Sequence, residues 1–91
     1  IGSYTMDAAM NGALENTAVG HASLGALTTG ERNTAIGYNS LLTAETGVKN
    51  TMVGAYTGFR MLEGSDYNTA IGASAFSGVH ATTQSDYNVA I

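Results

Sequence analysis

The sequence contains no cysteine, no proline and no tryptophan, and only three of its 91 residues are basic. Without cysteine, a disulfide framework, a zinc ribbon and a thiol nucleophile are excluded. Seven acidic residues give a net charge of -4, so we expect no nucleic-acid partner. No apolar run approaches the ~18 residues of a membrane span, and no basic-then-apolar leader is present. Because the chain begins with Ile1 rather than Met, we expect an excised or processed piece.

Large side chains are also scarce, because small residues replace them. The chain has 14 alanines, 12 threonines and 12 glycines, which together exceed 40% of the residues. Alanine alone supplies more than a third of the apolar residues. A conventional hydrophobic core would be poorly filled with this composition.

A short motif recurs along the whole chain. Asn-Thr-Ala-Val-Gly at residues 16–20 returns with small changes at 33–37, 50–54 and 68–72, and a last copy begins at residue 88. The spacings between copies are 17, 17, 18 and 20 residues. We therefore interpret residues 1–91 as a single repeat array that is truncated inside a unit at both ends.

Aligned on the motif, the units show fixed columns. The asparagine column is Asn16, Asn33, Asn50, Asn68 and Asn88. The β-branched column is Val19, Ile36, Val53, Ile71 and Ile91, and the glycine column after it is Gly20, Gly37, Gly54 and Gly72. A second glycine recurs in mid-unit, as in Gly30 and Gly47, where we expect a turn with positive φ.

The motif has the two-residue period of a β-strand. Thr34 and Ile36 share one face, and Asn33 and Ala35 share the other. A unit of 17–20 residues fits two short strands and two turns, which is one coil of an all-β β-solenoid. Stacked about 4.8 Å apart, five coils would form Asn, Thr and Val/Ile ladders, with the Val/Ile ladder in the core and Glu15 beside Arg32. We expect a homotrimer that packs its small-residue Ala and Gly faces together.

The run Asn-Thr-Ala-Ile-Gly-Tyr-Asn-Ser-Leu-Leu at residues 33–42 resembles the repeats of phage tail-fibre and surface-fibre proteins. Those repeats are similar to the head repeats of YadA-like trimeric autotransporter adhesins. The resemblance implies a left-handed parallel β-roll, assembled as an intertwined or side-by-side homotrimer. Two departures favour the fibre branch: Thr stands where the adhesin motif usually has its first Val, and the units are longer. A viral and a bacterial origin both remain open.

Residues that could carry chemistry are few and dispersed. His21 and His80 occupy different columns, and the acidic residues fall mostly in or near the expected turns. Asp66 and Asp86 share a Ser-Asp-Tyr-Asn context but lack the glycine-rich pattern of calcium-binding rolls. No phosphate-loop motif and no Ser-His-Asp constellation are present. We therefore expect no enzyme, no metal site and no cofactor.

Three functions follow as hypotheses. The first is a structural segment of a trimeric fibre or adhesin, located outside the cell on a virion or bacterial surface. The second is a module that binds a host receptor or glycan through variable turns, with contact residues Asp66, Tyr67, Asp86 and Tyr87. A further set of tyrosines could stack on sugars, or fill space near a trimer seam: Tyr4, Tyr38 and Tyr56. The third is an ice-binding solenoid. It is disfavoured because ice-binding faces usually carry two Thr columns in register, Thr-x-Thr, whereas here the column two residues after Thr is Val or Ile, which we assign to the core.

Overall fold

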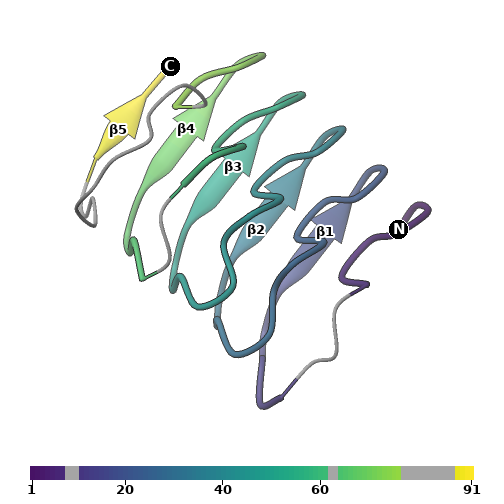
Figure 1. Cartoon of the computed structure of the whole chain (residues 1–91). Helices are drawn as coiled ribbons and strands as arrows, with labels where there is room; N and C mark the ends of the chain where they lie inside the picture. Colours follow the sequence, from purple (N-terminus) through teal and green to yellow (C-terminus); the bar gives the residue numbers. More distant parts are fainter. Residues whose placement is uncertain (8–10, 62–63, 77–87) are drawn as a thin grey trace.

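The computed structural model describes residues 1–7, 11–61, 64–76 and 88–91 of the chain. Its strands are β1 (Thr17–Val19), β2 (Thr34–Ile36), β3 (Thr51–Val53), β4 (Thr69–Ile71) and β5 (Val89–Ala90). They form one parallel sheet in the order β1-β2-β3-β4-β5 (Figure 1). No helix occurs in the described residues. The all-β prediction is confirmed, and the arrangement is consistent with a β-solenoid.

Each strand pairs with the strand one repeat unit further along. Thr17 is in register with Thr34, and Thr34 with Thr51. The longer spacings late in the chain do not disturb this register, because Thr51 still pairs with Thr69, and Thr69 with Val89. Extra residues are therefore accommodated outside the sheet.

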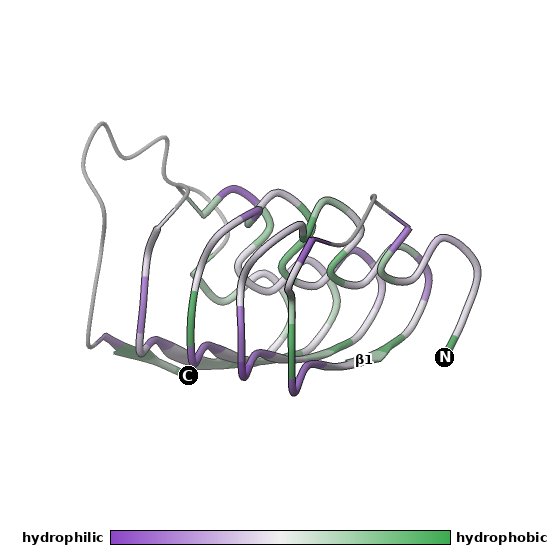
Figure 2. Ribbon diagram, turned by 90° about the horizontal axis from the view of Figure 1, so that it is seen from below, coloured by the Kyte–Doolittle hydropathy of each residue, from purple (hydrophilic) through white to green (hydrophobic). Residues whose placement is uncertain are grey.

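The side of each unit opposite the sheet consists of loops (Figure 2). The expectation of two strands per unit is wrong for the described residues, where each unit has one. The loops nevertheless bond to one another: Leu24 N donates to Ser40 O at 3.0 Å, and Leu41 N to Thr57 O at 2.8 Å. Successive units are thus joined by backbone hydrogen bonds on both sides.

Left-handed backbone explains why the loops are not strands. Thirteen described residues other than glycine have positive φ, and they fall into three columns of the repeat. The columns are Tyr4, Ala22, Asn39, Tyr56 and Ser74; then Met6, Leu24, Leu41 and Phe76; and then Glu15, Arg32, Lys49 and Tyr67. A left-handed residue turns an extended chain sharply. These columns bend every unit at the same points.

The core is built from the middle residue of each strand and from loop leucines. Ala35, Met52 and Ala70 are fully buried, and Leu24, Leu27 and Leu41 fill the space beneath the sheet. The prediction that the Val/Ile column lies in the core is wrong, since Ile36 is 39% exposed and Ile71 45%. The loop leucines already fill the narrow interior, so a strand has room inside only for a small side chain.

One unit departs from this pattern of small strand residues and loop leucines at two positions, and the two changes in side-chain volume compensate for each other. Met52 stands where the neighbouring strands have alanine, and Gly58 stands where the units before it have Leu24 and Leu41. A Cβ added to Gly58 would lie 3.1 Å from the Met52 sulfur. The larger strand residue therefore occupies volume that the loop leucine fills in other units.

The two glycine columns require glycine for different reasons. Motif glycines have positive φ, 137° at Gly37, and a Cβ there would lie 2.5 Å from the carbonyl carbon of Gly54. In mid-unit, the expectation of positive φ is confirmed at Gly12 (86°) and Gly64 (75°) and is wrong at Gly30 and Gly47. Gly30 and Gly47 must be glycine because the backbone of the next unit lies too close for a side chain. A Cβ on Gly47 would lie 2.8 Å from Ser65 O.

Candidate interaction surfaces

The asparagine column forms a continuous internal ladder. Asn50 donates from its backbone N and its Nδ2 to Asn33 Oδ1, at 2.9 and 3.1 Å. Asn50 Oδ1 in turn accepts both corresponding hydrogen bonds from Asn68, at 3.0 and 3.1 Å. Asn33, Asn50 and Asn68 are buried. The predicted ladder is confirmed, and its burial makes it a structural element of the fold that no partner can contact.

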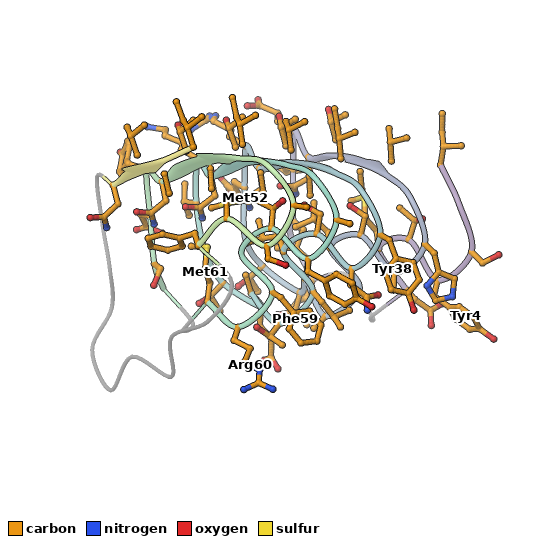
Figure 3. All side chains as sticks on the ribbon, turned by 90° about the horizontal axis from the view of Figure 1, so that it is seen from above. Tyr4, Tyr38, Met52, Phe59, Arg60 and Met61 are labelled. Atoms are coloured by element: carbon orange, nitrogen blue, oxygen red, sulfur yellow. The ribbon has the colours of Figure 1, made fainter. Side chains whose placement is uncertain are left out.

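The outer side of the sheet is the first surface that a partner can reach. We call it the sheet face and define it as the outward residues of the strands and their continuation: Thr17, Val19, Thr34, Ile36, Thr51, Val53, Thr69, Ile71, Val89 and Ile91. Side chains stand in a row along this side of the sheet (Figure 3). Strand side chains alternate between faces, so the buried alanines place Thr and Val/Ile together on the outside.

The sheet face carries no charged side chain along its length and combines a Thr column with an apolar Val/Ile column. None of the five strands contains a charged residue. Exposed β-branched side chains continue from Val19 (36% exposed) to Ile71 (45%) and Val89 (73%). Single exposed apolar residues are common, but a contiguous row of them marks an interaction surface.

Charged residues border the sheet face just before the strands. Arg32 Nε donates to Glu15 Oε2 at 2.6 Å, as the repeat predicts. This hydrogen bond raises the pKa of Arg32. In the next unit Lys49 lies over the Tyr67 ring, with its Nζ 4.7 Å from the ring centroid. Solvent surrounds the Glu15–Arg32 pair, so it marks the edge of the face and contributes little to stability.

A second surface is a row of aromatic rings on the looped side. We call it the ring ladder and define it as Tyr4, His21, Tyr38, Tyr56 and Phe59. Neighbouring ring centroids along it are 5.3, 5.2, 5.3 and 5.5 Å apart. Its labelled members Tyr4, Tyr38 and Phe59 lie away from the row of side chains on the sheet (Figure 3). The ring ladder and the sheet face are therefore separate surfaces.

Backbone hydrogen bonds between units hold the ring ladder in place. Tyr56 N donates to Tyr38 O at 2.8 Å, and Asn39 N, next to Tyr38, donates to His21 O at 2.9 Å. Four of the rings arise from two adjacent sequence columns, one and two residues after the motif glycine, and the fifth, Phe59, lies three residues after Tyr56 in the same unit. A search for one conserved column therefore misses His21, whereas a search for an aromatic residue at either position finds it.

The predicted turn residues fall into two groups. Asp66 Oδ1 accepts a hydrogen bond from Val48 N at 2.7 Å, and the Tyr67 hydroxyl accepts one from Lys49 Nζ at 3.0 Å. Both residues thus fasten one unit to the preceding one. Asp86 and Tyr87 lie outside the described residues, as does His80.

The described part of the chain contains no cluster of three or more His, Cys, Asp or Glu that could hold a metal ion. Within the same residues, no helix is long and apolar enough to cross a membrane. Comparison of the chain with known protein families, curated proteins and solved structures finds no match. The sheet face and the ring ladder are therefore the features of the molecule that point to a function.

Proposed function

We propose that the chain is a structural segment of a trimeric fibre that serves attachment outside the cell, at a virion or bacterial surface. The exposed, uncharged sheet face is the observation that carries this proposal. Burial of apolar surface drives association, and an outward Val/Ile row in every unit provides such surface along the whole array.

The surface proposed for association differs from the one expected from composition. Alanines of the strands point into each unit, and motif glycines contact the glycine of the next unit within the same chain. The alanines are buried and the glycines carry no side chain, so neither column offers an apolar side-chain surface to a second chain. The Val/Ile column replaces them as the contact surface. The left-handedness of the β-roll and the three-fold number of the assembly are what the resemblance to fibre repeats implies.

A repetitive face also suits a fibre mechanically. Each unit contributes one Thr and one Val or Ile, in a register that the parallel pairing fixes. The interface area then grows with the number of units. A long array can therefore reach the roughly 800 Å² per partner that specific interfaces usually bury. The outcome is a stiff rod in which longer arrays associate more tightly.

Sedimentation of the intact chain over a concentration series tests this proposal. We expect a trimer for the wild type, dissociation for Ile36→Lys, and retention of the trimer for Thr46→Lys. The control has a similar charge change at an exposed loop position. A wild-type chain that stays monomeric at every concentration would overturn the proposal. Circular dichroism on each variant separates loss of association from loss of fold.

The same surface favours a second candidate, ice binding. The exposure of Ile36 and Ile71 removes one reason against it, the assignment of the Val/Ile column to the core, whereas the absence of a second Thr column stands. A row of outward Thr and Val/Ile side chains in parallel register remains, with Thr17, Val19, Ile36 and Ile71 exposed and the others partly buried. Thermal hysteresis by a monomeric chain, lost in Ile36→Lys, would favour this function over assembly. Absence of hysteresis would eliminate it.

A further inference from the structure

We infer that the ring ladder is a carbohydrate-binding strip that takes an extended oligosaccharide along the stacking axis of the units. The inference goes beyond the structural role proposed above and depends on different residues. It concerns Tyr4, His21, Tyr38, Tyr56 and Phe59, none of which lies on the sheet face. The two proposals can therefore fail independently.

Exposure is the first argument. Tyr4 is 64% exposed, Tyr38 46% and Tyr56 41%, and His21 is exposed as well. Rings that served only to fill the interior would be covered, as the loop leucines are. A large aromatic surface kept in solvent is typical of a recognition site.

The polar atoms of the ladder provide the second argument. In the described residues, the hydroxyls of Tyr4, Tyr38 and Tyr56 form none of the side-chain hydrogen bonds. Each of these residues thus offers an apolar ring beside an available donor and acceptor. A pyranose presents the same combination, with a C–H face and equatorial hydroxyls, so the sugar and the ring ladder are complementary.

The charge and geometry of the ring ladder restrict the class of ligand that it can bind. The ladder itself contains no Asp, Glu, Lys or Arg, and Arg60 lies 6.0 Å from the Phe59 ring at one end only. An uncharged chain of sugar rings fits such a strip better than a charged polymer. The centroid spacing is regular over three successive pairs in consecutive units, from Tyr4 to Tyr56, and this favours a repeating ligand. The backbone hydrogen bonds between units fix the positions of these residues before binding.

The repeat also supplies well-matched variants. Ala55 and Ala73 occupy the column of Tyr38, and Ala22 occupies that of Tyr56. Tyr38→Ala and Tyr56→Ala therefore introduce a residue that the fold already accepts at the same position of another unit. Tyr67→Ala is the control, since Tyr67 has the same 41% exposure as Tyr56 but lies outside the ladder.

The test is calorimetric titration of the 91-residue chain with cellohexaose and with chitohexaose, and with a proline decapeptide as the competing ligand class. We expect binding of at least one oligosaccharide, weakened about fivefold or more by Tyr38→Ala and by Tyr56→Ala. Tyr67→Ala should change the affinity by less than about twofold. Because the chain lacks tryptophan, a change in tyrosine fluorescence on binding gives an independent readout.

Three outcomes would overturn the inference: no binding of either oligosaccharide, binding that the ladder variants leave unchanged, or binding of the proline peptide alone. Thermal unfolding of each variant excludes loss of fold as the cause of lost binding. Ile36→Lys separates the two proposals, because it removes the proposed association and leaves the ring ladder intact. Oligosaccharide binding by a wild-type chain that is monomeric would contradict the trimer and support the strip.

Discussion

The sheet side and the looped side of the molecule keep the same register but tolerate different changes. On the sheet side, the first four strands all read Thr, then Ala or Met, then Val or Ile. On the looped side, the column facing the core varies from Leu24 and Leu41 to Gly58 and Phe76. The strands and the glycines that follow them fix how units stack, whereas the loops adjust the volume between them.

The contrast is sharpest where backbones from two units meet. After β1, β2 and β3 the motif glycine contacts its equivalent in the next unit, so no side chain fits there. At Gly12, in a loop, a Cβ would meet nothing within 4 Å. Substitution of equivalent residue types on the two sides should therefore have very different costs.

Gly37→Ala should produce the largest effect, a loss of about 4 kcal/mol in the free energy of unfolding. The added Cβ would collide with the Gly54 carbonyl, and alanine is strained at a φ of 137°. Urea unfolding followed by circular dichroism measures the change. Gly12→Ala is the matched control and should cost only about 1 kcal/mol, from its φ of 86°. Equal losses would show that close stacking of the glycines is not what the fold requires.

Asn50→Ala should destabilise the chain by about 3 kcal/mol, because it interrupts the buried ladder on both sides. The variant keeps the backbone hydrogen bond to Asn33 Oδ1. It loses the two hydrogen bonds that Asn50 Nδ2 donates to Asn33 Oδ1 and Ser65 O, and the two that Asn50 Oδ1 accepts from Asn68. Asn11→Ala, at an exposed loop position, should change stability by less than about 0.5 kcal/mol. Similar values for the two variants in the same unfolding experiment would rule out a stabilising ladder.

Met52→Ala tests whether strand and loop volumes compensate. We expect a loss of about 2 kcal/mol from the cavity that it leaves, and a loss for Gly58→Leu from overpacking against Met52. The double variant restores the alanine and leucine found in the units before it. It should therefore recover at least about 1 kcal/mol relative to the sum of the single changes. Additive losses would mean that the two positions do not share the same space.

Glu15→Gln should have the smallest effect. The ion pair with Arg32 is 2.6 Å long, but both side chains are at least half exposed, 62% and 50%. Solvent and salt screen such a pair, so the denaturation midpoint should not change measurably at low or high salt. A clear, salt-dependent loss would show that the border of the sheet face stabilises the fold more than its exposure indicates.

Much of the sheet side could be predicted from the sequence. The repeat of Asn-Thr-Ala-Ile-Gly indicated parallel stacking, its register, the asparagine ladder and the pair of Glu15 with Arg32. Period-two alternation also placed Thr34 with Ile36 and Asn33 with Ala35. Which face is buried could not be decided in this way, because both faces carry apolar residues. Hydrophobicity alone favoured Ile over Ala, whereas the limiting factor is the space that Leu24 and Leu41 leave inside.

The looped side was less predictable for a different reason. Left-handed backbone is usually signalled by Gly or Asn, but here it occurs at Leu24, Arg32 and Lys49. Stacking forces the bend at these columns whichever residue occupies them. The ring ladder was only partly visible, since Tyr38 and Tyr56 lie in adjacent columns and His21 completes the row only in three dimensions.

The orientation of the Val/Ile column is the central claim, and cysteine reactivity tests it most directly. The chain contains no cysteine, so Ala35→Cys and Ile36→Cys each introduce a single thiol at consecutive strand positions. In dilute solution, where chains are separate, Cys at position 36 should react rapidly with a thiol reagent in the folded chain, and Cys at position 35 should react only as fast as the chain unfolds. Equal rates, or faster reaction at position 35, would contradict an outward Val/Ile column and remove the sheet face.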